Sequence, residues 1–143
     1  MKVIGIAIDK AKAVFYVLEQ NDNDKLINIT RDFRFLTLKN DTDNSSVRNF
    51  QSTIFSFFDD IQPDRIAILT RQTKGRFKSA PLSFKIEGLI QCYEEIDIEF
   101  VSPHKILSYF KKNEFILDLE HEYQEKAARL AYYLISQSEI IDF

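Results

Sequence analysis

A helical repeat of apolar residues separates two groups of strand-forming segments, and this arrangement points to a mixed α/β fold. The apolar positions follow the spacing i, i+3, i+7, i+10, i+11 and i+14, which is one face of a helix. They are Val47, Phe50, Ile54, Phe57, Phe58 and Ile61. Ser45 or Ser46 is suited to cap this helix, and Pro63 is expected to end it.

Strand-forming segments lie on both sides of this helix. Three precede it, joined by short polar turns, and predict an antiparallel meander: residues 2–9, 13–19 and 26–38, the last of them long or bulged. After it, strands 65–70 and 97–101 alternate with helices at about 81–94, 103–112 and 119–137. A meander followed by two crossovers predicts an α/β fold with a five-stranded mixed sheet, order 3-2-1-4-5, and helices on both faces.

Length and composition favour one globular domain over residues 1–143, with 45% hydrophobic and 29% charged residues. The lone cysteine, Cys92, is expected to be a buried small hydrophobe in a reducing compartment. No apolar stretch approaches the length of a membrane span, so we expect a cytoplasmic protein with no membrane partner. The net charge of −3 argues against a general nucleic-acid coat protein but leaves room for a local basic patch.

The order of elements resembles the RNase H-like superfamily, most closely its RuvC-like branch of Holliday-junction resolvases. It also resembles a family of small uncharacterised bacterial proteins in that superfamily. The resemblance rests on four short motifs in order: Val3-Ile4-Gly5-Ile6, Thr73-Lys74-Gly75-Arg76-Phe77, Phe84-Lys85-Ile86-Glu87-Gly88 and Ser102-Pro103. It implies a function connected with nucleic acid, although a fold does not by itself fix a function.

The resemblance also implies where catalytic carboxylates would lie. Members that cut nucleic acid hold two divalent ions roughly 4 Å apart with several carboxylates, which activate water and stabilise the leaving oxygen. In RuvC-like enzymes the first aspartate follows a glycine-hydrophobic pair in the first strand, and the matching residue here is Ala7. Asp9 leaves the same face of the strand but lies roughly 6–7 Å further along it. It either replaces the missing ligand through a bulge or simply ends the strand.

The remaining carboxylates implied by the resemblance are also incomplete. The fourth strand ends at Thr70-Arg71, without an acid. On the final helix, Glu125 or Glu122 matches the third position, and both also fit a solvated helix face. Glu87 is an additional carboxylate in the third motif. It either points into the site or is a surface residue or salt-bridge partner. An active enzyme would therefore depend on Asp9, Glu87 and Glu125.

The loop over residues 71–78 is basic and contains no acid. Its cations are Arg71, Lys74, Arg76 and Lys78. Gly75 allows the backbone to approach a ligand closely, and the loop leads to a helix N-terminus, which is a natural phosphate site. The loop is therefore a candidate nucleic-acid-binding segment, and the alternative is a solvated loop on an acidic protein.

These observations leave three functions open. The first is a degenerate, non-catalytic domain that binds nucleic acid, or a nucleic-acid-associated protein, through the 71–78 loop. The second is a divergent Mg²⁺-dependent, structure-selective endonuclease. The third is a protein–protein adaptor, and the aromatic surplus also allows a homodimer. Neither His104 nor His121 has a partner at metal-ligand spacing, so we expect no metal or cofactor except Mg²⁺ under the second hypothesis.

Overall fold

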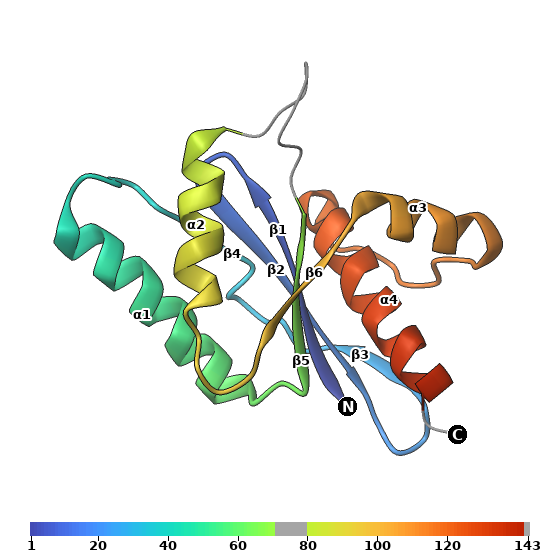
Figure 1. The fold of residues 1–143 in the computed structure, drawn as a ribbon. Coiled ribbons are helices and arrows are strands. Elements are labelled where there is room, and N and C mark those ends of the chain that lie inside the picture. The colour runs from blue at the N-terminus through green and yellow to red at the C-terminus, as the bar shows by residue number, and fades with distance from the viewer. Residues whose placement is uncertain (71–79, 142–143) are drawn as a thin grey trace.

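The computed structural model describes residues 1–70 and 80–141, with side chains as far as Ser138. The strands are β1 Lys2–Asp9, β2 Lys12–Gln20, β3 Leu26–Asn28, β4 Phe35–Thr37, β5 Arg65–Leu69 and β6 Ile98–Val101. The helices are α1 Asn44–Ile61, α2 Pro81–Gln91, α3 Pro103–Lys112 and α4 Glu125–Ile141, and a short 3-10 helix, η1 Glu122–Gln124, precedes α4. Figure 1 shows α1 and α2 on one face of the central sheet and α3 and α4 on the other.

The sheet has the predicted strand order. Its path is β3-β2-β1-β5-β6, with β1 antiparallel to β2 and parallel to β5, and β5 parallel to β6. The central position of β1 agrees with its apolar sequence, because a strand buried on both faces has few polar residues.

The predicted third strand is not continuous. It divides into β3 and β4, which both pair with β2. Between them the Thr30 hydroxyl, in place of a backbone carbonyl, accepts a hydrogen bond from Val17 N–H at 2.8 Å, and Arg31 has a positive φ of 58°. The chain therefore leaves the ladder after β3 and returns at β4, because a side chain satisfies the donor between the two strands.

Two hydrophobic cores cover the two faces of the sheet. Alternate residues of β1 and β2 point to opposite sides, as strand geometry requires. Ile4, Ile6 and Phe15 pack with α1 and α2, whereas Val3 and Tyr16 pack with α4 and α3. The predicted apolar face of α1 lies in the first core, which contains its buried residues Phe50, Ile54 and Phe58.

The predicted N-terminal cap of α1 is wrong by two or three residues. Asp43 is the capping residue, and its carboxylate accepts a hydrogen bond from Ser45 N–H at 3.2 Å. A serine at position 45 lies inside the first turn and donates its backbone N–H to the cap. The helix ends at Ile61, and Gln62 takes a left-handed conformation before Pro63.

The prediction that Cys92 is buried is also wrong. Helix α2 ends at Gln91, earlier than the predicted 94, and Cys92 is its exposed C-terminal cap. The Cys92 thiol lies 3.3 Å from the Gly88 carbonyl, to which it donates. Apolar spacing did not reveal this, because the buried face of α2 is set by Ile86 and Ile90.

The last helix begins later than predicted, at Glu125 instead of about 119. The segment 113–121, which precedes η1, is not helical, and its apolar residues Phe115, Leu117 and Leu119 pack on the core at every second position. Gln124 is buried, and its side-chain amide donates to the Phe15 carbonyl at 2.8 Å. This contact fixes the start of α4 beside β2.

Arg65 joins three elements at the start of β5. Its guanidinium donates two hydrogen bonds to Glu99 of β6, at 2.8 and 2.6 Å. It also donates to the Leu134 carbonyl at 3.0 Å and to the Ser138 hydroxyl at 2.8 Å, both on α4. The hydrogen bond with Glu99 raises the pKa of Arg65 above its usual value, so the guanidinium stays charged.

We expect Arg65→Met to lower the free energy of unfolding by about 1.5–3 kcal/mol, because it removes charged hydrogen bonds to β6 and α4. Partial solvent exposure of Glu99 keeps the expected value below that of a fully buried pair. Urea denaturation followed by circular dichroism measures the change. Arg48→Met, at an exposed position of α1, is the control and should change stability by less than about 0.5 kcal/mol. Equal losses in both variants would contradict this role of Arg65.

Candidate nucleic-acid interface

The carboxyl ends of the parallel strands β1, β5 and β6 meet at one edge of the sheet, which we call the carboxyl-end edge. In Figure 1 this is the edge from which the chain leaves β5 toward α2, and α4 also begins there. The Ser83 hydroxyl near the start of α2 donates to the Lys10 carbonyl at 3.1 Å, which holds α2 against the β1–β2 turn. In open α/β sheets, ligands bind at such an edge. It is therefore the candidate site of this fold.

Ala7 and Asp9 occupy this edge at the end of β1. Ala7 is half-buried and packs against the core that contains α4, whereas Asp9 is exposed where β1 ends. In the sheet register Asp9 lies opposite Lys12 of β2. The two positions are on one face, as predicted, but the acid is at the solvent end and the alanine is beside the helix.

The end of β5 supplies no acid. Leu69 is its last residue, and Thr70 N–H donates to the Val101 carbonyl at 2.9 Å, which extends the pairing with β6. The chain then enters the segment 71–79, whose sequence contains no aspartate or glutamate. The predicted nucleic-acid-binding residues Arg71, Lys74, Arg76 and Lys78 lie in this segment, outside the described residues.

Glu125 lies in the first turn of α4 and is exposed. Its carboxylate accepts a hydrogen bond from Arg129 Nε at 3.0 Å. The Arg129 guanidinium in turn lies 4.9 Å from the ring centroid of Phe110 and 4.7 Å from that of Phe115. Glu125 is thus paired with a cation that two aromatic rings hold in place.

A cleft of about 510 Å³ lies beside this ion pair, between α3 and the start of α4. Leu69, Pro103, Leu107 and Lys126 are among its lining residues. Its walls are mainly apolar, with Lys126 and the Glu125–Arg129 pair at its α4 side. The cleft therefore offers more positive than negative charge at the carboxyl-end edge.

Glu87 belongs to the other layer of the molecule. It is half-buried on α2, whose buried residues pack on the sheet face opposite α4. Asp9, Glu87 and Glu125 therefore come from a strand end and from helices on opposite faces. Within residues 1–70 and 80–138 no three histidine, cysteine, aspartate or glutamate side chains gather as metal ligands.

The donor set at this edge does not fit a two-metal site. Two divalent ions bring four positive charges, which several convergent carboxylates must offset. Ala7, Leu69 and Thr70 contribute none, and Glu125 is already paired with Arg129.

A basic helix that the sequence analysis missed also begins at this edge. Helix α3 carries Lys105, Lys111 and Lys112 and no acid. A groove of about 470 Å³ between α3 and α4 is lined by His104, Lys105 and Lys112, among others. The signal was present as an acid-free run from position 100 to 113, but the sequence analysis predicted only a helix over 103–112 there.

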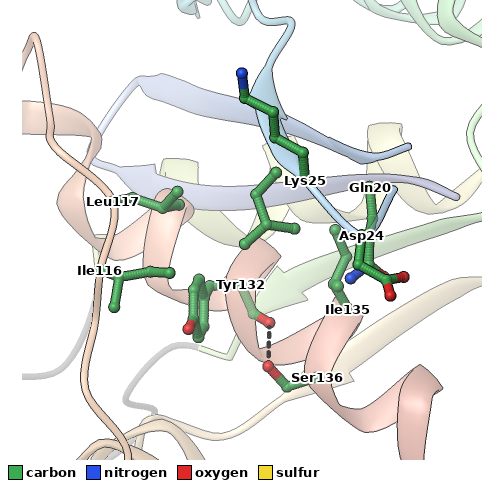
Figure 2. A pocket seen from close by; sticks show the side chains of 9 residues that line it. Gln20, Asp24, Lys25, Ile116, Leu117, Tyr132, Ile135 and Ser136 are labelled. Carbon is green, nitrogen blue, oxygen red and sulfur yellow. Dashed lines mark hydrogen bonds between the residues drawn. The ribbon is translucent and has the colours of Figure 1, made fainter. Parts of the chain in front are cut away.

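A larger cavity, of about 730 Å³, lies at the opposite end of the sheet (Figure 2). Gln20, Lys25, Ile116 and Tyr132 line part of it, and the Ser136 hydroxyl donates to the Tyr132 carbonyl at 3.0 Å. Gln20 N–H is bonded to the Met1 carbonyl, which places the cavity near the amino end of β1. Its size alone does not make it the functional site, because α/β ligand sites lie at the carboxyl ends of the strands.

The strand order, the two helical layers and the position of α4 give the chain an RNase H-like fold, in the arrangement found in RuvC. Thermus thermophilus RuvC, solved with a Holliday junction substrate, superposes with a TM-score of 0.72 at 11% identity, covering 98% of this chain and 96% of RuvC. The chain belongs to the family described as Protein of unknown function (DUF3010), whose model matches residues 1–134.

Two further solved structures share the fold. Fowlpox virus resolvase, solved with Holliday junction DNA, has a TM-score of 0.51 at 10% identity, with 100% of both chains covered. The yeast mitochondrial Holliday junction resolvase has a TM-score of 0.51 at 16% identity, covering 76% of this chain and 53% of the resolvase. No curated protein matches the chain. Among the described residues, no helix is long and apolar enough to cross a membrane.

Proposed function

We propose that this chain binds nucleic acid at the carboxyl-end edge and does not cut it. The observation that supports the proposal is that this edge, in a fold shared with resolvases, has several cations and few carboxylates. Cations are present there on α3 and α4. The end of β5, at Leu69 and Thr70, and the Ala7 position of β1 provide no carboxylate, and Asp9 lies at the exposed end of β1.

The binding is proposed to be electrostatic and local. Lys105, in the first turn of α3, and Lys126, in the first turn of α4, are described cations at this edge. Lys111 and Lys112 add positive charge in the last turn of α3. The basic segment 71–78 follows β5 and precedes α2 in the sequence, and it would add four more positive charges. Because cations that contact phosphates release counterions from the nucleic acid, binding at this edge is expected to weaken as salt rises.

We propose that the chain does not cut nucleic acid because too few carboxylates lie at this edge to bind two metal ions. An ion beside Ala7 would find Asp9 two residues further along β1, at its exposed end, and Glu125 already paired with Arg129. No cofactor is part of the proposal. The alternative, a divergent Mg²⁺-dependent endonuclease, requires Asp9, Glu87 and Glu125 to be brought together by the substrate.

A cleavage assay with Mn²⁺ tests this part of the proposal. We expect no cleavage of four-way junctions, single strands or RNA–DNA hybrids, while fluorescence anisotropy on the same substrates shows binding that weakens with salt. Cleavage that disappears in Asp9→Asn or Glu125→Gln, with folding intact, would establish the endonuclease instead. If no nucleic acid binds at all, the adaptor hypothesis, with a protein partner or a second copy of the chain, takes its place.

A further inference from the structure

Exposed aromatic rings and cations gather beside β4, on the α4 side of the sheet. We call this group the aromatic patch and define it as Lys12, Arg34, Phe35, His121 and Tyr123. Phe35 is 44% exposed and Tyr123 is 42% exposed. Both values are high for large aromatic side chains, which normally contribute to a core.

Contacts within the patch hold its rings in a fixed arrangement. The rings of Phe35 and Tyr123 meet edge to face, with centroids 5.8 Å apart. Lys12 Nζ lies 4.9 Å from the Phe35 centroid and 5.4 Å from the Tyr123 centroid. Arg34 Nε donates to the Tyr123 hydroxyl at 2.9 Å, and the His121 ring lies 5.5 Å from the Tyr123 ring. The patch is therefore organised before any ligand binds, which lowers the entropic cost of binding.

Core packing does not account for these rings. Neither Phe35 nor Tyr123 belongs to the buried residues of the two cores or to the partly buried residues packed against them. Their neighbours do: Val14, which pairs with Phe35, is buried in the core beside α4, and Leu36 packs on the opposite core. Both faces of the sheet at β4 are therefore packed without the two rings, which expose apolar area to solvent.

The patch borders the proposed nucleic-acid interface. Tyr123 precedes Glu125, the first residue of α4, by two positions, and Lys12 lies opposite Asp9 at the end of β1. A strand that contacts the carboxyl-end edge would therefore need only a short extension past the start of α4 to reach Phe35.

We infer that the aromatic patch binds an unpaired nucleotide of a single strand, an inference that rests on the proposed function. Base stacking on exposed rings is tolerant of sequence and is the usual way in which proteins hold single strands. Lys12 and Arg34 supply positive charge for the flanking phosphates. A duplex hides its base faces, so the patch discriminates in favour of unpaired nucleotides.

Acidic neighbours limit the strength of this site. Asp32 lies 3.9 Å from Arg34 and is fully exposed, and Asp9 lies opposite Lys12. Each reduces the net positive charge of the patch. Stacking, more than phosphate attraction, is therefore expected to supply its selectivity.

The test compares binding of a fluorescent oligothymidylate of about 12 nucleotides with binding of a duplex of equal length, by anisotropy. We expect Phe35→Leu combined with Tyr123→Leu to weaken single-strand binding about tenfold or more and to leave duplex binding within about twofold. Tyr123→Phe keeps a stacking ring and should retain most of the affinity. Phe55→Leu is the matched control, because Phe55 is a half-buried ring on α1, which packs on the sheet face opposite the patch.

A direct readout uses the absence of tryptophan from the sequence. Tyr123→Trp places the single tryptophan of the chain in the patch, and stacking with a base is expected to quench its fluorescence. Ile27→Trp, at an exposed position of β3 at the opposite end of the sheet, should be unaffected. Single-strand binding that is equal in wild type and double variant, with no quenching, would overturn the patch and leave the proposed function standing. If the wild type binds neither oligothymidylate nor duplex, the proposed function fails and the patch inference fails with it.

Discussion

Gly5→Ala is expected to lower the free energy of unfolding by at least about 3 kcal/mol, a large fraction of the stability of a domain. A Cβ atom at Gly5 would lie 2.2 Å from the Ala127 carbonyl oxygen and 2.8 Å from the Ala131 backbone nitrogen. Both atoms belong to the backbone of α4, so no side-chain rotation relieves the overlap. Either α4 moves away from β1 or the chain does not fold. Urea denaturation followed by circular dichroism measures the loss.

Gly88 provides a matched control for this substitution. It lies within α2, and an added Cβ there meets no atom within 4 Å. Gly88→Ala should therefore raise stability by about 0.5–1 kcal/mol, because alanine loses less backbone entropy in a helix than glycine does. Similar effects of the two substitutions, in sign and size, would contradict the close contact between β1 and α4.

The close contact at Gly5 also bears on function. Ala127, Ala128 and Ala131 are all fully buried, so α4 presents a face of small residues to β1 and lies close to the sheet. This packing sets the position of Glu125 and Arg129 at the carboxyl-end edge. A Gly5 variant that still folds is therefore expected to bind nucleic acid more weakly, through displacement of α4.

Local patterns were sufficient to predict the strand order. The apolar run of β1 and the helical repeat of α1 each reflect burial, and topology rules then leave few ways to connect them. Division of the third strand depended on the Thr30 hydroxyl reaching Val17 across the ladder, a tertiary contact that no local pattern contains. The same holds for the Asp43 cap, where several adjacent polar residues were equally suitable.

The candidate site was harder to predict because its parts are distant in the sequence. The aromatic patch joins Arg34 to Tyr123 across 89 positions, and neither residue belongs to a recognisable motif. The basic character of α3 was visible in the sequence. Its relevance to binding could be inferred only from the structure, in which α3 starts at the carboxyl-end edge. Ala7, by contrast, was informative from the sequence, because the resemblance assigned a specific acid to its position.

Replacing Arg71, Lys74, Arg76 and Lys78 together with alanine is expected to weaken DNA binding by about 10²–10³-fold at about 0.1 M salt. Each phosphate contact contributes about 0.9 to the slope of log affinity against log salt on duplex DNA, so loss of four contacts would flatten the slope by up to about 3.6. Anisotropy titrations at several salt concentrations give both quantities. The effect should be similar for different sequences, because phosphate contacts carry no base information.

The decisive comparison uses a variant with the same change in net charge at the other end of the sheet. Lys25→Glu combined with Arg31→Asp also removes four charge units, at two exposed positions, and aspartate tolerates the positive φ of residue 31. If binding depends on the carboxyl-end edge, this control should lose much less affinity than the quadruple variant, because screening shortens the reach of charges to about 10 Å at 0.1 M salt. Equal losses would mean that binding follows the net charge of the chain, and an unchanged slope in the quadruple variant would remove the 71–78 loop from the interface.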